Sequence, residues 1–426
     1  MAPPQRILYP PEKISMEWKQ RQRAGAGLHN LGNTCFLNST LQCLTYTPPL
    51  ANYLLSREHS QSCHRQDLCM MCSMEEHVNK ALQSSDTAIQ PWAVVRVLAR
   101  IGKDFQLGMQ GGARQCLHRT VNTMQRACLS RRSSLDISSR STTIIHQIFM
   151  GYLRSRVTCL SCNAVSDSHR SFLDIILDIE AASSVTAALE NFVKPQQLDG
   201  ENCFKCSKCD KMAAASKKIT VHHVPRVLTM CLKRREDVTG KKISKAVEYP
   251  QYLDLRPYTS QTAGEPILYS LYAVLVHSGD TCHAGHYFCY VKASDGLWYK
   301  MNDASVDPCD FDTVLGQQAY LLFYVRCSEL QVEERVSSSP SSASSFFSQG
   351  VAGSKQARSV EPQGLPHQTE VSGEEQTLPR ERLRSRSPRQ GYELRSRFVE
   401  HTEHQHSRGR RMEKTECERE NSQEDI

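Results

Sequence analysis

The sequence contains no apolar run long enough to cross a membrane and no internal repeat. A transmembrane helix needs about 20 consecutive apolar residues, so we expect no membrane partner. The N-terminal segment MAPPQRILYPPEK also lacks the apolar core of a secretory signal. We therefore expect a reducing compartment, in which the 18 cysteines serve as metal ligands, nucleophile and core residues rather than as disulfides.

The chain also lacks a charge excess strong enough to identify a partner. Its formal net charge is +7 over 426 residues. Residues 328–426 hold 15 Lys and Arg against 17 Asp and Glu, so the positive excess lies in residues 1–327. A balance this modest indicates neither a nucleic acid nor any other partner by itself.

Composition divides the chain into three parts. Residues 1–24 are polar and proline-bearing, and we interpret them as a lead-in. Residues from 25 to about 147 are mostly helical in pattern, whereas β-branched and aromatic segments predict strands from about 148 to 327. Residues 328–426 include SSSPSSASSFFSQG and lack the apolar content that would offset chain entropy, which predicts disorder.

Several short segments carry definite predictions of secondary structure. LNSTLQCL places Leu37, Leu41 and Leu44 at helical spacing, and the Pro48-Pro49 pair ends that helix. One later helix is predicted with Val185, Leu189, Phe192 and Val193 on a single face. The strand candidates are FLDIILDI, VLTMCLK, YSLYAVLVH, HYFCYVK, LWYKM and AYLLFYV.

Cys35 lies where the loop GLHNLGNT meets the helical pattern of FLNSTLQCL. A helix N-terminus lowers the pKa of a thiol, so this position favours a nucleophile. Gly27 and Gly32 are expected to let the backbone approach a substrate closely. Asn30, five residues before Cys35, is positioned to direct its amide at an oxyanion beside the Cys35 N–H group.

A thiol nucleophile needs a base, and His286 in HAGHYFCY is the candidate. Gly285 is expected to allow close packing against a substrate tail. Asn302 or Asp303, in the following segment LWYKMND, can supply the acceptor that orients the imidazole. The competing interpretation is a buried helix thiol and a strand histidine without chemistry, which holds for most isolated pairs of this kind.

Longer motifs around both residues favour the catalytic interpretation. GLHNLGNTCFLNSTLQCL resembles the Cys box of the ubiquitin-specific proteases, peptidase family C19, and HAGHYFCYVKASDGLWYKMND followed by AYLLFYV resembles their His box. The similarity spans about Gly25 to Cys327 in the expected order. It implies an α+β, papain-like cysteine protease fold with a thumb (25–147) and with fingers and palm (148–327).

The resemblance also implies an activity and a set of site residues. The family cleaves the (iso)peptide bond after the C-terminal glycine of ubiquitin, so ubiquitin and ubiquitinated proteins are the implied partners. On the matching positions, Cys35 resembles the nucleophile, His286 the general base and Asn302 the orienting residue. Asp303 matches the auxiliary acid, and Asn30 matches the oxyanion-hole amide.

Two CxxC pairs, Cys159 with Cys162 and Cys206 with Cys209, predict a zinc site. Four thiolates close a tetrahedral Zn²⁺ site, which here would join two distant hairpins. The competing interpretation is four reduced thiols, and Cys203 lies close enough in sequence to be a decoy. The resemblance supports the metal, because many relatives carry such a pair at the tips of the fingers.

A second cluster of potential ligands occupies the segment SCHRQDLCMMCSMEEH. Cys63, Cys69, Cys72 and His77 are predicted to form a Cys₃His zinc site, against the alternative of a loop with exposed histidines and buried cysteines. Neither zinc site would be catalytic, because four protein ligands leave no position open for water.

The sequence departs from the family pattern at two places. Residues 110–117 read QGGARQCL where the family has an acidic motif of the QQDAHEFL kind, so Gly112, Arg114 and Gln115 replace Asp, His and Glu. Acids there would hold the basic tail of ubiquitin, and losing a desolvated pair costs about 2–5 kcal/mol. The two glycines are also expected to weaken the helix that starts there. The alternative function is therefore a weakened or inactive ubiquitin-binding scaffold.

The second departure is LKRRED, where relatives read LKRF. Arg235 would be costly in place of a buried aromatic residue unless its guanidinium reaches solvent.

The tail carries one locally basic segment, with seven arginines between Arg380 and Arg397. We expect a nuclear address or solvated filler there, and so a nuclear protein with the cytoplasm as second compartment. Phosphate binding is the weaker expectation, because nearby glutamates reduce the field. It would describe a third alternative, an RNA-associated nuclear factor.

Overall fold

The computed structural model describes residues 3–64, 69–84, 87–101, 107–130, 135–236, 239–282 and 284–328. The predicted disordered tail, apart from Ser328, lies outside these residues, as does its arginine-rich segment. Among the described residues, none of the helices combines the length and apolar character that a bilayer span requires.

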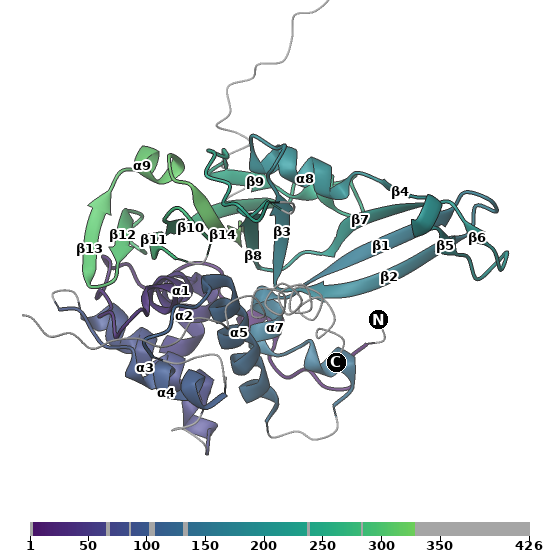
Figure 1. Cartoon of the computed structure of the whole chain (residues 1–426). Coiled ribbons are helices and arrows are strands. Elements are labelled where there is room, and N and C mark those ends of the chain that lie inside the picture. Colours follow the sequence, from purple (N-terminus) through teal and green to yellow (C-terminus); the bar gives the residue numbers. More distant parts are fainter. Residues whose placement is uncertain are drawn as a thin grey trace, which may run out of the picture. The chain divides into compact units, whose positions relative to one another are not determined.

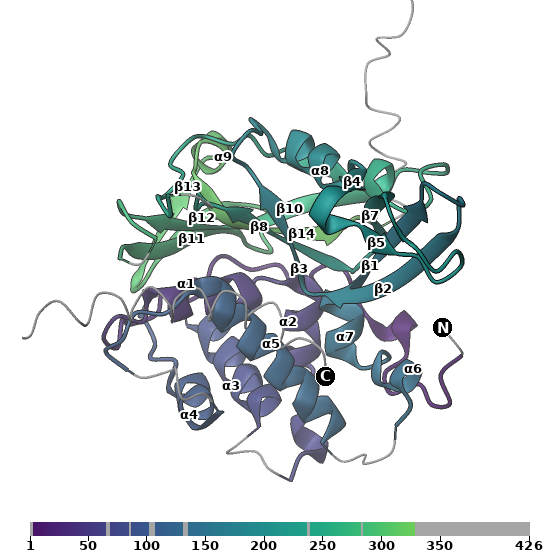
Figure 2. The ribbon, with the colours of Figure 1, turned by 45° about the vertical axis from the view of Figure 1, so that its right-hand side comes forward.

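Helices dominate the described chain before residue 150 and lie together on one side of the sheets (Figures 1 and 2). Two further helices, α8 and α9, stand between strands. The bounds are α1 Cys35–Thr45, α2 Pro48–Leu55, α3 Met70–Gln83, α4 Trp92–Ile101, α5 Ala113–Leu129, α6 Ile137–Arg140, α7 Ile144–Phe149, α8 Val185–Val193 and α9 Phe311–Leu315, with 3₁₀ turns η1 Pro11–Lys13, η2 Ser60–Ser62, η4 Gly200–Asn202 and η5 Arg256–Tyr258.

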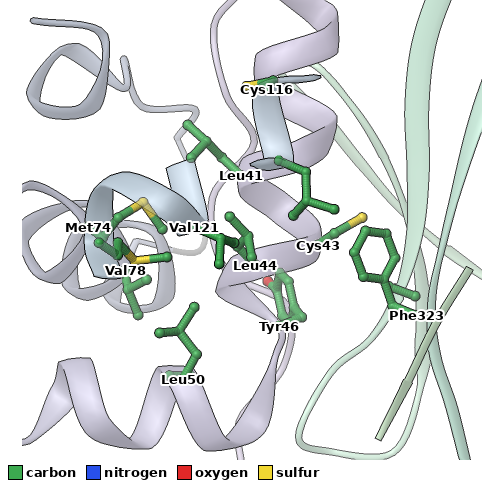
Figure 3. Close-up of a cluster of buried hydrophobic side chains, with 14 of the residues drawn as sticks. Leu41, Cys43, Leu44, Tyr46, Leu50, Met74, Val78, Cys116, Val121 and Phe323 are labelled. Atoms are coloured by element: carbon green, nitrogen blue, oxygen red, sulfur yellow. The ribbon is translucent and has the colours of Figure 1, made fainter. Parts of the chain in front are cut away.

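Helix α1 lies between the other helices and the sheet, and every one of its residues is buried. Figure 3 shows Cys43 pointing toward Phe323 of β14, with Met74 and Val78 of α3 on the opposite side of Leu44. Burying a leucine contributes about 1.5–3 kcal/mol, so this contact on both sides fixes the helix that begins with Cys35.

The Pro48-Pro49 pair has two effects. It ends α1 as predicted, at Thr45, and it also starts α2, since proline fits the first positions of a helix.

The larger sheet, which we call the palm sheet, runs in the order β13-β12-β11-β10-β14-β8-β3, with β9 paired to β10. Its pairs are antiparallel except β3 with β8. The bounds are β3 Asp174–Asp178, β8 Val227–Lys233, β9 Tyr252–Asp254, β10 Leu268–Ser278, β11 His286–Lys292, β12 Trp298–Asn302, β13 Ser305–Cys309 and β14 Ala319–Arg326. Strand β11, which begins with His286, thus lies between β10 and β12.

The second sheet, the fingers sheet, has the order β2-β1-β7-β4 and extends away from the helices (Figure 1). A two-stranded hairpin, β5 with β6, lies at its far end. The bounds are β1 Gly151–Cys159, β2 Val165–Phe172, β4 Gln196–Leu198, β5 Phe204–Lys205, β6 Met212–Ala213 and β7 Ala215–His223.

The predicted α+β class is confirmed, with helices first and strands afterwards. Each of the six predicted strand segments forms a strand: β3, β8, β10, β11, β12 and β14. The predicted later helix is α8, which buries Val185 and Leu189. Strands β1 and β2 were not predicted, because their side chains are mostly polar and partly or fully exposed.

Candidate active site

The sulfur of Cys35 lies at the first residue of α1, after Thr34 at the N-cap. Its side chain is buried, with a residue exposure of 4%. Burial raises the pKa of Cys35, a main-chain hydrogen bond from Tyr287 lowers it, and the charge of Asp303 raises it again. The net shift is upward, so the resting nucleophile is a thiol and needs a base. Tyr287 is the residue after His286, which places that histidine's strand directly against the thiol.

His286 and Asn302 form a short contact on neighbouring strands. Their strands pair Cys289 with Met301, and this register makes His286 and Asn302 diagonal neighbours on one face. The His286 Nε2 atom lies 2.6 Å from the Asn302 Oδ1 atom. An amide oxygen only accepts, so Nε2 carries the proton and Nδ1 is left as the basic nitrogen. Asn302 therefore fixes the tautomer that base catalysis requires.

Asp303 follows Asn302 but points elsewhere, because it begins the tight turn between β12 and β13 with φ +49°. Its carboxylate accepts hydrogen bonds from Asn30 Nδ2 at 2.9 Å and from Asn38 Nδ2 at 2.8 Å. The two candidates for the orienting role are thus separated: Asn302 contacts His286, and Asp303 ties the palm to the loop and helix around Cys35.

The Asn30 side chain is held at both ends. Its Oδ1 atom accepts hydrogen bonds from the main-chain N–H groups of Gly32 and Thr34, at 3.0 and 3.1 Å. Its amide nitrogen donates to Asp303. The amide that sequence reasoning directed at an oxyanion is therefore fixed in orientation beside the N-terminus of α1.

Two glycines pack against the chain itself rather than against an open cleft. A Cβ atom at Gly27 would lie 2.2 Å from the carbonyl oxygen of Ala304, and one at Gly285 would lie 2.1 Å from that of Ser278. The close approach that sequence reasoning assigned to substrate is thus made by the backbone on either side of the site. Gly32 does adopt a positive φ of 99°.

A thiol at a helix start, and an imidazole with an orienting amide, therefore lie on two elements that pack together, α1 and β11, from segments 251 residues apart. Residues 26–324 match the family model described as ubiquitin carboxyl-terminal hydrolase. The chain belongs to this family. The match covers helices α1 to α9, nearly all of both sheets, and Cys35, His286, Asn302, Asp303 and Asn30.

Two human proteins are among the curated relatives of this member of the ubiquitin carboxyl-terminal hydrolase family. Human ubiquitin carboxyl-terminal hydrolase 42 is 57% identical over 331 residues, which cover 78% of this chain but 25% of that protein. Human ubiquitin carboxyl-terminal hydrolase 17-like protein 11 is 51% identical over 329 residues, covering 77% of this chain and 61% of that protein. The chain thus spans a quarter and about three-fifths of these relatives.

A solved structure shares the fold. It is described as the SAGA Ubp8/Sgf11/Sus1/Sgf73 DUB module bound to ubiquitin aldehyde. The matched chain is 27% identical, with a TM-score of 0.65, and the match covers 74% of this chain and 72% of that one. The papain-like α+β fold expected for a ubiquitin carboxyl-terminal hydrolase is therefore confirmed.

The altered segment 110–117 begins helix α5 of this hydrolase domain. Gly112 is the N-cap residue, with φ −85° and ψ 131°, and the helix proper starts at Ala113. The expectation that the glycine pair weakens the helix is wrong, because both glycines lie before its first residue. Gln110 donates from Nε2 to the main-chain oxygen of Gly285 at 3.1 Å, which joins this segment to the start of β11.

Arg114 is turned toward the palm sheet. Its Nε atom lies 2.5 Å from Asp174 Oδ2 and its Nη2 atom 3.1 Å from Oδ1, while His118 Nε2 lies 2.9 Å from Oδ1. Burial alone would raise the pKa of Asp174, but the hydrogen bonds from His118 and Arg114 lower it to about 2. The positive charge of Arg114 is thus offset by a neighbouring carboxylate.

Replacing Asp174 by asparagine should lower the free energy of unfolding at pH 7 by about 3 kcal/mol, because a buried pair would lose its anion. The native pKa is depressed, so the carboxylate's contribution is present above pH 4 and is lost as the pH falls toward 2. Urea unfolding of both proteins at several pH values checks this. The difference between them should shrink between pH 4 and pH 2, and a constant difference would contradict the assignment.

The LKRRED segment ends β8 with two arginines in different surroundings. Arg235 is exposed, so the condition under which sequence reasoning tolerated it is met. Arg234 is buried and donates to the main-chain oxygens of Ala319, Ile243 and Lys245, at 2.7, 3.1 and 2.9 Å. It fastens the end of β8 to the chain around it.

The four cysteines of the two CxxC pairs come together at the far end of the fingers sheet. The sulfur atoms of Cys159, Cys162, Cys206 and Cys209 all lie within 4.8 Å of one another, and Cys162 and Cys206 are 3.7 Å apart. Zn–S bonds of about 2.3 Å in a tetrahedron separate sulfurs by roughly 3.8 Å. The cluster is compatible with a structural zinc ion, and Cys203 is not part of it.

The second predicted cluster needs a correction. Cys63, Cys69 and Cys72 do come together, but the histidine beside them is His59, not His77. His77 lies on the buried face of α3, where neither ring nitrogen has a hydrogen-bond partner and burial lowers its pKa to about 4. One and a half helical turns separate Cys72 from His77, so α3 directs the two side chains to different faces.

Three residues that make these contacts were missed by sequence reasoning: Asn38, His59 and Asp174. Asn38 follows Cys35 by three residues, and this helical spacing indicated a shared face. His59 precedes Cys63 by four residues, which was a comparable signal. Asp174 gave no local signal, because its partners Arg114 and His118 lie more than fifty residues away in sequence.

Proposed function

We propose that this chain is a cysteine-type deubiquitinase that hydrolyses (iso)peptide bonds at the C-terminal glycine of ubiquitin. The observation that carries the proposal is the 2.6 Å contact between His286 and Asn302. The residue after His286, Tyr287, contacts the thiol of Cys35 through its main chain, so β11 lies against the thiol. Membership of the ubiquitin carboxyl-terminal hydrolase family supplies the substrate class.

The proposed reaction follows from these positions. His286 Nδ1 takes the proton of the Cys35 thiol, and the sulfur attacks the carbonyl carbon of the terminal glycine. The Cys35 N–H group at the start of α1, with Asn30 beside it, stabilises the oxyanion. The imidazolium then gives its proton to the leaving amine. A water, deprotonated by the same nitrogen, finally releases the acyl group and restores the thiol.

The direct test is covalent labelling of the full chain with an electrophilic probe built on ubiquitin. Labelling is expected with the native protein and not with Cys35→Ala. Cys43→Ala is a control, since that thiol is on the same helix but is fully buried. Absence of labelling in a folded protein, or labelling that survives Cys35→Ala, would overturn the proposal.

A second candidate, a ubiquitin-binding scaffold with weakened catalysis, is favoured by one observation: the helix start at Gly112 carries no acid. The two candidates differ in what they predict for turnover and binding. A scaffold would retain ubiquitin in a pull-down while releasing no fluorophore from a ubiquitin C-terminal conjugate, and a deubiquitinase would release it.

We further propose that the CxxC pairs bind structural zinc. Among the described residues, the apolar cluster around them has Cys159, Cys206 and Ala213 as its buried members, with Ala164 and Phe204 packed against it, so the hairpin at the tip has a small core. The cluster lies at the end of the fingers sheet that points away from the helices, and four protein ligands leave no open position, which supports a structural role.

Removing one ligand should loosen the tip of the fingers without abolishing the reactivity of the Cys35 thiol. Cys209→Ser is expected to lose one equivalent of zinc and to admit proteolytic cleavage near residues 200–213. Cys203→Ser, a neighbouring cysteine outside the cluster, should change neither. Equal metal content in the Cys209→Ser protein, measured by mass spectrometry, would count against the site.

Nuclear localisation remains a proposal that rests on the arginine-rich segment 380–397, outside the described residues. A fluorescent fusion lacking residues 328–426 should leave the nucleus if this segment is the address. Loss of RNA retention in the same deletion would favour the RNA-associated alternative instead.

A further inference from the structure

Outside the active site and the fingers, one group of side chains has the composition of a metal site. His59, Cys63, Cys69 and Cys72 each offer a ligand atom, and these atoms all lie within 4.8 Å of one another. His59 Nε2 is 3.1 Å from Cys69 Sγ. One imidazole and three thiolates are a common ligand set for structural zinc.

The local backbone directs these four side chains to one point. After α2 ends, Arg57 takes a left-handed conformation (φ +57°) and the chain reverses into η2. The Cys63 N–H group donates to Ser60 O at 3.2 Å, so His59 and Cys63 flank a single turn. Cys69 is the N-cap of α3 and Cys72 stands in its first turn, so both thiols lie at the start of that helix.

A hydrogen bond outside the ligands holds the two halves together. Ser60, inside the turn, donates from Oγ to Glu75 Oε1 at 2.5 Å, and Glu75 is buried one turn beyond Cys72 on α3. Such outer contacts fix the orientation of metal ligands before the ion binds. The geometry is thus held by residues that are not themselves ligands.

Ordinary core packing does not account for the group. Cys69 is buried, but His59, Cys63 and Cys72 are only half-buried. Three of the four side chains are therefore partly exposed to solvent. No disulfide joins the three cysteines in the described chain. Clustering without full burial and without a covalent bond is what a partly exposed metal site requires.

We propose that His59, Cys63, Cys69 and Cys72 bind a second zinc ion, which joins the turn after α2 to the start of α3. Four protein ligands leave no open position, so the ion is structural. The proposal is independent of the deubiquitinase activity, because it concerns metal content alone.

The test is the zinc content of the full chain, purified under reducing conditions and measured by mass spectrometry. Two ions per chain are expected, and a single ion that Cys206→Ser removes would overturn the proposal. His59→Ala should reduce two to one. His77→Leu, which alters the histidine that the sequence suggested, should retain two.

A second measurement does not depend on the folding of His59→Ala and uses Cys206→Ser. This protein loses the fingers ion and should still hold one zinc; holding none would contradict the second site. Titration of the metal-free native chain with Co²⁺ gives the same answer without any variant. Thiolate-to-cobalt absorbance should correspond to seven thiolates, and a plateau at four would exclude the site.

Discussion

Replacing His286 by alanine should lower kcat/KM for a ubiquitin C-terminal fluorogenic substrate by about 10²–10⁴-fold, the range for loss of a general base. The reason lies in the thiol. Burial raises the pKa of Cys35, so little thiolate forms at neutral pH unless a neighbouring base removes the proton. The rate of the variant should then climb roughly tenfold per pH unit below that raised pKa, whereas the native enzyme should depend less steeply on pH over the same range.

The matched control is His277→Phe. His277 stacks on Tyr287 with ring centroids 4.3 Å apart, and phenylalanine keeps a ring there. This variant should stay within a few-fold of the native rate. A His286→Ala protein that kept native turnover at pH 7 would remove this histidine from the mechanism, whatever happens to the control.

Restoring an acid at Gly112 should raise kcat/KM by about one and a half to three and a half orders of magnitude, mostly through a lower KM. The tail of ubiquitin is basic, and a desolvated acid–base pair there is worth about 2–5 kcal/mol. The position can accept the change: a Cβ atom added to Gly112 would meet only Gln115 Oε1, at 3.7 Å. The gain should shrink in high salt, because salt screens the attraction between the acid and the basic tail as the two approach.

Gly112→Asn separates charge from every other effect of the substitution. Asparagine and aspartate are equally good N-cap residues, so any stabilisation of α5 is common to both variants and only the charge differs. Gly111→Asp is a poor alternative, since a Cβ there would lie 2.8 Å from the Phe36 ring. If aspartate and asparagine at position 112 give the same kinetics, tail capture at this point does not limit the enzyme.

The strands that sequence could predict are those that are buried. The apolar segment VLTMCLK becomes a palm strand buried along almost its whole length. Apolar composition does not predict the fingers strands, because β2 exposes nearly every residue. What holds them is main-chain pairing over eight registered residues, and pairing with a distant strand leaves no mark in local composition.

The candidate site divides in a similar way. Cys35, His286 and Asn302 are carried by long contiguous motifs, so the contact between His286 and Asn302 could be anticipated. Asp174 could not, since its role depends on β3 pairing in parallel with β8 beside α5. His59 was within reach of spacing arguments, but a choice between two nearby histidines requires knowing which face of α3 is buried.

The placement of β11 between β10 and β12, with β14 on the other edge of β10, has a consequence for the newborn chain. Cys35 leaves the ribosome early, whereas the strands that complete its surroundings are translated almost three hundred residues later. At 5–20 residues per second this interval is roughly 15–60 s. During synthesis, therefore, Cys35 stands without the palm strands that surround it in the folded protein, and a message truncated before the last strand yields a product in which the palm sheet around β11 is incomplete.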